Sequence, residues 1–182
     1  MSKYNSDSIE TLRFPENVRK NPSMYIGGTD AHGRFVILRE LADNAVDEYL
    51  ADRNKFVAIM INSDGSYYVQ DGGSGIPQGV KTVELNVNGK TVKSKMPTMQ
   101  AVFGELHTSG KFRSEAYAVS IGSHGVGVKG TNATSDYFNV TTCYKGEWFK
   151  IGFKKGKLTT PVTKTTAPKS PFTGKTLTKG TL

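Results

Sequence analysis

The order of one long helix and the strands around it most constrains the fold of this chain. Residues 31–53, AHGRFVILRELADNAVDEYLADR, place apolar side chains at helical spacing. Two predicted strands, 56–62 and 66–71, follow and are joined by a tight turn at Asp64-Gly65. Helices and strands do not alternate along the chain, so a doubly wound parallel sheet is disfavoured. The pattern favours a mixed sheet with helices on one face.

Further elements are predicted in the second half. We expect a hairpin in VELNVNGKTV, turning at Asn88-Gly89, and a helix in PTMQAVFGELH. A helix is expected to open in VGVKGTNATS, and the strands YFNVTTCY and EWFKIGF are expected to pair around Lys145-Gly146. The remainder, rich in Thr, Lys and Pro, is predicted to be a tail with a strand at its end.

Length and composition predict one cytoplasmic domain, or one in a host cytoplasm if the chain is viral. The 182 residues suffice for a single core, and no apolar run approaches the ~20 residues that span a bilayer. The N-terminus has no apolar signal core. The single cysteine, Cys143, excludes an internal disulfide and a cysteine-based metal site.

The net charge of +8 is concentrated at one end of the chain. Residues 1–144 are balanced, whereas residues 145–182 carry nine lysines and a single acid, Glu147. Such a segment fits either a nucleic-acid contact or an ordinary solvated surface, and the sequence leaves both open.

A glycine-rich stretch, IGSHGVGVKGTNATS, contains a literal G-x-G-x-x-G from Gly125 to Gly130. A dinucleotide fingerprint is disfavoured because no buried strand precedes it and only 52 residues follow it. A Walker loop at Gly174-Lys175-Thr176 fails because Lys169 stands where its first glycine belongs. What remains is a glycine turn that feeds a helix and can hold phosphate, or a plain loop.

A polar stripe follows one face of the long helix. Its members, spaced i, i+4, i+7 and i+8, are Glu40, Asn44, Asp47 and Glu48. No Lys or Arg interleaves on that face, which is unusual for the solvated side of a helix, the alternative interpretation. An amide oxygen one turn from a carboxylate suits a Mg²⁺ ion that also contacts substrate phosphates, and a carboxylate can accept a proton from water.

The stretch VQDGGSGIP places Asp71 between a strand and a loop with three glycines. A carboxylate there can accept a hydrogen bond from a ligand amine while the glycines permit close approach. The alternative is a turn capped by the aspartate.

Together and in this order, the motifs resemble the GHKL (Bergerat-fold) ATPases, and most closely the ATPase domain of type IIA DNA topoisomerases. VRKNPSMYIG resembles their strap, ELADNAVDE their N-box helix, and VQDGGSGIP their adenine loop. LHTSGKF and SIGSHGVGVKGTNATS resemble the ATP lid, and the terminal KGTL a strand of the adenine site. The resemblance implies an α+β, two-layer sandwich with a mixed, mostly antiparallel sheet and helices on one face.

The resemblance also implies roles for individual residues. Glu40 would be the general base, Asn44 the Mg²⁺ ligand, and Asp71, aided by Thr181, the acceptor of the adenine amino group. Lys111 would contact phosphate unless it is a solvated loop lysine, and Tyr4 would reach a partner's site unless the terminus is disordered. The other implied nucleotide contacts are Glu48, Gly73, Gly75, Ile76, Pro77, Val102, Tyr117, Gly122, Ser123, His124, Gly125, Val126, Gly127 and Val128.

Three departures from the family pattern stand out. The loop after Asp71 reads Gly72-Gly73-Ser74, where bacterial gyrases typically have an acid and then an arginine, so Glu48 is expected to lose that salt-bridge partner. Tyr144 replaces another arginine, and we therefore expect weak binding of aminocoumarins. The stretch TVELNVNGKTVKSK is longer than its counterpart and predicts a projecting hairpin, and the sequence stops before a transducer domain.

By resemblance, residues 1–14 would form an arm and residues 15–182 the ATPase domain of a topoisomerase B subunit. ATP and Mg²⁺ would be its cofactors. Its partners would be DNA, a second B subunit on ATP binding, and an A-type cleavage subunit or fused cleavage domain, with no membrane. The alternatives are another GHKL ATPase, such as a mismatch-repair protein, or a non-enzymatic nucleic-acid-binding module.

Overall fold

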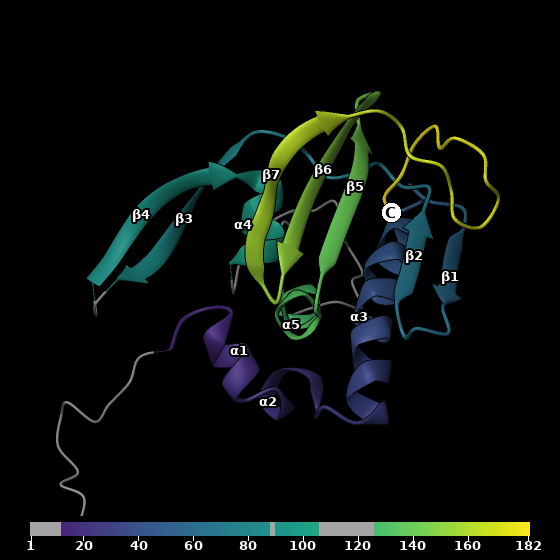
Figure 1. Cartoon of the computed structure of the whole chain (residues 1–182). Coiled ribbons are helices and arrows are strands. Elements are labelled where there is room, and N and C mark those ends of the chain that lie inside the picture. The colour runs from purple at the N-terminus through teal and green to yellow at the C-terminus, as the bar shows by residue number, and fades with distance from the viewer. Residues whose placement is uncertain (1–11, 88–89, 106–125) are drawn as a thin grey trace, which may run out of the picture.

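The computed structural model describes residues 12–87, 90–105 and 126–182 (Figure 1). The helices in this part of the chain are α1 (Glu16–Lys20), α2 (Ser23–Ile26), α3 (Ala31–Leu50), α4 (Thr98–Gly104) and α5 (Gly127–Thr134). The strands are β1 (Val57–Ile61), β2 (Tyr67–Asp71), β3 (Val80–Val87), β4 (Lys90–Pro97), β5 (Phe138–Tyr144), β6 (Glu147–Lys154) and β7 (Lys157–Thr165).

The main sheet is assembled from two halves that the last residues of the sequence join. β1 pairs with β2, and β5, β6 and β7 pair in that order. Thr181 forms antiparallel bridges to both Asp71 of β2 and Thr142 of β5. Figure 1 shows the C-terminus between these two strands. All strand pairings within the described residues are antiparallel, which confirms the predicted α+β class.

Helix α3 starts where the sequence predicts and ends three residues earlier. The side chain of Asp30 caps it, with Oδ1 accepting a hydrogen bond from the Gly33 backbone N–H at 3.0 Å. After Leu50 the backbone turns, and Asp52 adopts a left-handed φ of 54°. The helix lies alongside β1 and β2 (Figure 1).

The largest apolar cluster lies between the β5–β7 half of the sheet and helix α4. Its buried members are Met99, Phe103, Val140, Ile151 and Phe153. The two layers of the sandwich are therefore held together by alternate residues of β5 and β6 packing on one face of a short helix. Helix α5 is fixed to α4 by a hydrogen bond from the Asn132 side-chain amide to the Phe103 carbonyl, 3.0 Å long.

The predicted hairpin is confirmed as β3 and β4, which pair from Val80–Pro97 to Val87–Lys90. It extends sideways from the body of the molecule in Figure 1. Its base is anchored by a small cluster in which Val83 and Met96 pack on Ala101 of α4. The projection is thus tied to the core at one end only.

The tail prediction is wrong for residues 157–165, which form strand β7 on the edge of the sheet. The strand alternates little in polarity and contains Pro161, features that an edge strand tolerates and that hide it in the sequence. The β5–β6 turn is as predicted, with Lys145 and Gly146 at positive φ values of 51° and 81°. None of the helices in the described residues combines the length and apolar character needed to cross a bilayer.

Candidate functional site

The polar stripe of α3 is not a solvated helix face. Asp47 is fully buried, and the side chains of Glu40 and Glu48 keep only 25% and 17% of their exposure. Acidic side chains at such depth need specific partners. The stripe is therefore largely buried within the protein instead of facing bulk water.

At one end of the stripe, Glu40 meets the first residue of α5. A side chain on Gly127 would collide with the Glu40 side chain as it lies here, so any other residue at position 127 requires Glu40 to move. No side chain caps α5 among the described residues, and its N-terminal backbone N–H groups carry the positive end of the helix dipole. Glu40 and an anion-attracting helix terminus thus lie together.

Asn44 sits one turn further along α3, between the two glutamates. Its side-chain N–H donates to the Glu40 carbonyl oxygen at 2.6 Å. With the nitrogen used in this way, the amide oxygen is the atom that would meet a cation. The described residues contain no group of three His, Cys, Asp or Glu side chains that could hold a metal alone. A cation here would need oxygen ligands from its substrate, as Mg²⁺ often takes.

At the other end of the stripe, Asp71 ends β2. Its Oδ1 accepts hydrogen bonds from the backbone N–H groups of Gly73 at 2.7 Å and Thr181 at 3.3 Å. Burial raises the pKa of Asp71 from 3.8 to about 6; the two hydrogen bonds oppose this shift, and the nearby charge of Glu48 adds to it. A Cβ on Gly73 would press on both carboxylates.

Glu48 has a partner that the sequence did not indicate. Arg53, just beyond α3, donates from Nη2 to Oε1 at 3.0 Å and from Nε to Oε2 at 3.3 Å. Oε2 also accepts from the Ser74 backbone N–H at 3.2 Å. The loop after Asp71 supplies no arginine to Glu48, as expected, and Arg53 from beyond the helix end pairs with it instead.

Two further polar residues hold the loop that follows Asp71, and the sequence analysis missed both. Asn54 is buried, and its Oδ1 accepts from the Gly72 backbone N–H at 2.8 Å. Thr142 Oγ1 accepts from the Ile76 backbone N–H at 3.0 Å and lies 3.0 Å from the Thr181 hydroxyl. These contacts join positions far apart in the sequence, and no local pattern announces them.

Comparison with known proteins was made by sequence and by structure. No family model matches the chain. It is 38% identical to the B subunit of DNA gyrase from Thermus thermophilus, over 87% of this chain and 24% of that protein. Identity to the B subunit of DNA gyrase from Mycolicibacterium smegmatis is 45%, over 81% of this chain and 20% of that protein. The B subunit of DNA topoisomerase 4 from Staphylococcus aureus is 39% identical, over 84% of this chain and 21% of that protein.

A solved structure extends the likeness to the fold. It is the 43K ATPase domain of Thermus thermophilus gyrase B in complex with an aminocoumarin, with a TM-score of 0.62 and 32% identity, covering 91% of this chain and 37% of that one. The chain belongs to the GHKL ATPase domains of type IIA topoisomerase B subunits. It spans about a quarter or less of the length of the relatives matched by sequence.

Further residues of this GHKL domain that were predicted to contact the nucleotide also lie in the described part of the chain. Ile76, Val102 and Val128 are partly buried against the same apolar cluster, so the structure brings them together. Gly75 has a φ of +74° and lies against the Cys143 backbone, with no room for a side chain, whereas Pro77 is exposed. Whether each touches a nucleotide stays a prediction.

Several residues predicted for the nucleotide site lie outside the described part of the chain. They are Tyr4, Lys111, Tyr117, Gly122, Ser123, His124 and Gly125. Val126 is described and precedes α5, where its carbonyl oxygen accepts from Gly130 at 2.8 Å.

One buried cation follows the glycine turn. Lys129 is fully buried within α5, and burial lowers its pKa to about 7, although Glu105 opposes this shift. Burial in turn raises the pKa of the Glu105 carboxyl. The negative charge of Glu105, which directly follows α4, thus favours the charged form of this buried lysine.

Proposed function

We propose that this chain is the Mg²⁺-dependent ATP-binding and ATP-hydrolysing domain of a type IIA DNA topoisomerase B subunit. One observation carries the proposal, which is the row of polar side chains along α3. The row begins at Glu40, which lies against Gly127 of α5, and ends at Glu48, which lies near Asp71 of β2. Eight helical residues separate the ends, about 12 Å. An adenine nucleotide lying along the row would place its base at Asp71 and its terminal phosphate at α5.

Asp71 would fix the base. As a carboxylate held by the backbone N–H groups of Gly73 and Thr181, it has remaining acceptor capacity for an exocyclic amine. Its position is set by β2 and the 180–182 segment together, which gives the geometric precision that base recognition needs.

Glu40 would take the proton of the water that attacks the γ-phosphate, yielding ADP and inorganic phosphate. The backbone N–H groups at the start of α5 would stabilise the charge on the transferred group. Asn44, through its amide oxygen, would hold Mg²⁺, whose contribution is neutralisation of phosphate charge. The donor set fits because one amide oxygen leaves room for phosphate and water ligands.

In a full-length enzyme, we propose that ATP binding pairs two B subunits around DNA and that hydrolysis reopens them. Residues 1–14 would serve as an arm that reaches the partner, with residues 15–182 as the ATPase domain. An A-type subunit or fused cleavage domain would cut the DNA, and the enzyme would act in the cytoplasm of a cell or of a viral host.

Calorimetry with ADP and with a non-hydrolysable ATP analogue plus Mg²⁺ tests the proposal on the chain as given. We expect binding of both nucleotides and very slow ATP turnover. A structure with the analogue should place it along α3. Absence of ADP binding at millimolar concentration, with DNA still bound, would favour the nucleic-acid module instead.

A further inference from the structure

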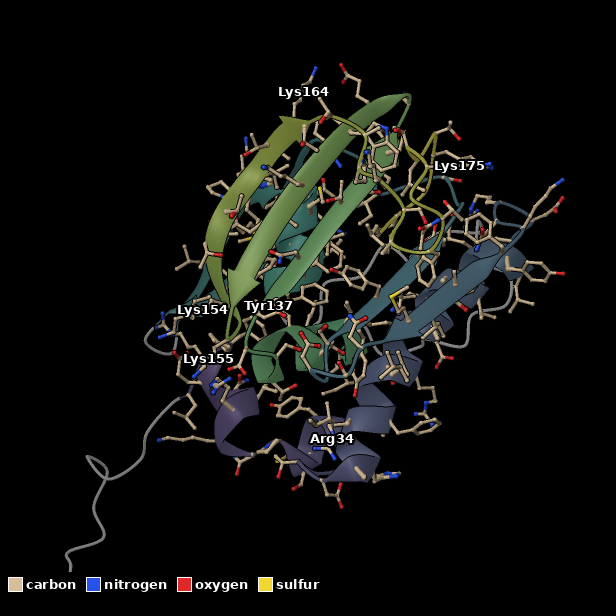
Figure 2. The ribbon with its side chains drawn as sticks, turned by 45° about the vertical axis from the view of Figure 1, so that its right-hand side comes forward. Arg34, Tyr137, Lys154, Lys155, Lys164 and Lys175 are labelled. Carbon is tan, nitrogen blue, oxygen red and sulfur yellow. The ribbon has the colours of Figure 1, made fainter. Side chains whose placement is uncertain are left out.

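A basic groove lies at the foot of the molecule, where α1 meets the turn between β6 and β7. Its volume is about 630 Å³. The cations that line it are Arg19 and Lys20 at the end of α1 and Lys154, Lys155 and Lys157 around the turn, and all five are exposed. Figure 2 labels Lys154 and Lys155 there, at the opposite end of the sheet from Lys164 and far from Lys175.

Two acidic side chains among the described residues pair with lysines of the groove. Lys157 pairs with Glu16 at 3.0 Å, and Lys155 pairs with Asp136 at 3.7 Å. In each pair, at least one of the two side chains is more than half exposed. Exposed pairs of this kind are weak and exchange readily for other anions. The groove therefore keeps a positive surface to which an approaching polyanion can bind.

The fold holds these cations in place. Lys155 and Gly156 form a tight turn at φ values of 52° and 80°, and Gly156 is pressed against Pro15 and Ala133 with no room for a side chain. Arg19 donates from Nη1 to the Ala133 carbonyl oxygen at 2.7 Å. The cationic side chains of the groove thus project from a region where α1, α5 and the sheet pack together.

An aromatic side chain joins the cations. Tyr137 is 61% exposed and directly precedes β5. Because Phe138 pairs with Phe153, the antiparallel register brings Tyr137 opposite Lys154, and Figure 2 shows the two side by side. An exposed tyrosine among lysines gives a hydroxyl donor for phosphate and a ring for sugar contacts.

We propose that this basic groove, with Tyr137, is a docking surface for the phosphate backbone of duplex DNA. The inference rests on the proposed function, which supplies duplex DNA as the substrate, and it assigns part of the lysine-rich segment a role. The groove lies by the C-terminal end of α5, at Ala133, whereas the proposed phosphate site is at its N-terminal end, at Gly127. DNA bound in the groove leaves the nucleotide site accessible.

The contacts are with phosphates, so binding is insensitive to base sequence and falls steeply with salt. Each phosphate contact contributes about 0.9 to the slope of log affinity against log salt concentration. Losing two lysines lowers that slope by about 1.8.

The test measures fluorescence polarisation of a labelled duplex of roughly 20 base pairs, without nucleotide, across a salt series. The double variant Lys154→Gln/Lys155→Asn removes two groove charges, and asparagine tolerates the left-handed φ at position 155. The matched control, Lys169→Gln/Lys175→Asn, removes the same net charge from exposed positions elsewhere in the lysine-rich segment. ADP affinity is measured in parallel for all three proteins.

We expect the groove variant to bind DNA at least about tenfold more weakly at low salt, and the control to change by less than about twofold. Equal losses in the two variants would overturn the proposal and make the segment a general solvated surface. An acidic peptide that displaces the duplex at equal charge concentration would also overturn it. DNA binding that depends on the groove without ADP binding would refute the ATPase function alone, and the reverse result would refute the groove alone.

Discussion

The two ends of the α3 row are built in different ways. At the proposed adenine end, Asp71 and Glu48 accept hydrogen bonds from the loop after β2, from Arg53 just beyond α3 and from Thr181. At the proposed phosphate end, Glu40 lies against Gly127, Asn44 donates to the Glu40 carbonyl oxygen at 2.6 Å, and Thr131 of α5 donates to the Ile37 carbonyl oxygen at 3.5 Å. We propose that the first set of contacts fixes the base of ADP and ATP alike, and that the second set lies where the γ-phosphate of ATP would react. The variants below probe each end separately.

The largest effect is expected from Glu40→Gln, which removes the proposed base and keeps the shape of the side chain. General-base catalysis contributes about 10²–10⁴-fold, so ATP turnover should fall by that factor while ATP affinity stays within a few-fold. Steady-state phosphate release and calorimetry measure the two quantities. Asp43→Asn, on the same helix but paired with Arg39 at 3.8 Å, is the control and should hydrolyse normally. Undiminished turnover in Glu40→Gln would assign the base elsewhere.

Gly127→Ala tests the phosphate end by adding a methyl group next to Glu40. The added methyl group cannot coexist with the Glu40 carboxylate, so one of the two must move. We expect affinity for a non-hydrolysable ATP analogue to fall about 100-fold, and ADP affinity to fall much less.

The control for this substitution is Gly104→Ala in α4, where a Cβ makes ordinary contact with Phe153 at 3.5 Å. That variant should bind both nucleotides as the wild type does. If Gly127→Ala weakens ADP and the ATP analogue equally, the two ends do not act separately.

Asp71→Asn tests the adenine end. Loss of a charged acceptor for the base should lower ADP affinity about 30-fold at pH 8. Because the pKa of Asp71 is about 6, wild-type ADP affinity should also fall as the pH is lowered through 6, whereas the asparagine variant should show no such step. Calorimetry between pH 5 and pH 8 measures both.

The Asp71 carboxyl should also make the free energy of unfolding depend on pH. Its folded pKa lies above the ordinary 3.8, so the folded state binds the proton more tightly than the unfolded state does. The wild type should therefore lose stability, relative to Asp71→Asn, as the pH rises from about 4 to about 6. Denaturant titrations that show the opposite trend would contradict the assigned environment.

The smallest effect is expected from Arg53→Gln. Glu48 would keep its hydrogen bond from Ser74 but lose the guanidinium, so the loop would be less firmly held. ADP affinity should fall about fivefold, consistent with a partly buried ion pair, and the loss should grow towards pH 6 because the unshielded Glu48 raises the pKa of Asp71 further. Arg34→Gln, exposed at the other end of α3, should change neither quantity.

Local sequence was enough to predict which of the residues proposed for this site share one helix face or follow one strand, and their roles stay predictions. Glu40 and Asn44 follow from helical spacing, and Asp71 follows from its position between a strand and glycines. The roles of Arg53, Asn54 and Thr142 could not be predicted, because each depends on which distant backbone comes close after folding. Strand β7 was missed for a related reason, since its identity comes from pairing with β6 and not from its own polar residues.

The segment from Gly180 to Leu182 joins β2 and β5, the facing strands of the two halves of the sheet, which lie about seventy positions apart in the sequence. A growing chain leaves the ribosome from its N-terminus, so β2 and β5 emerge with the space between them unfilled. The two halves of the sheet can therefore be joined only after residues 180–182 have been synthesised, and the hydrogen bond from Thr181 to Asp71 forms no earlier than that.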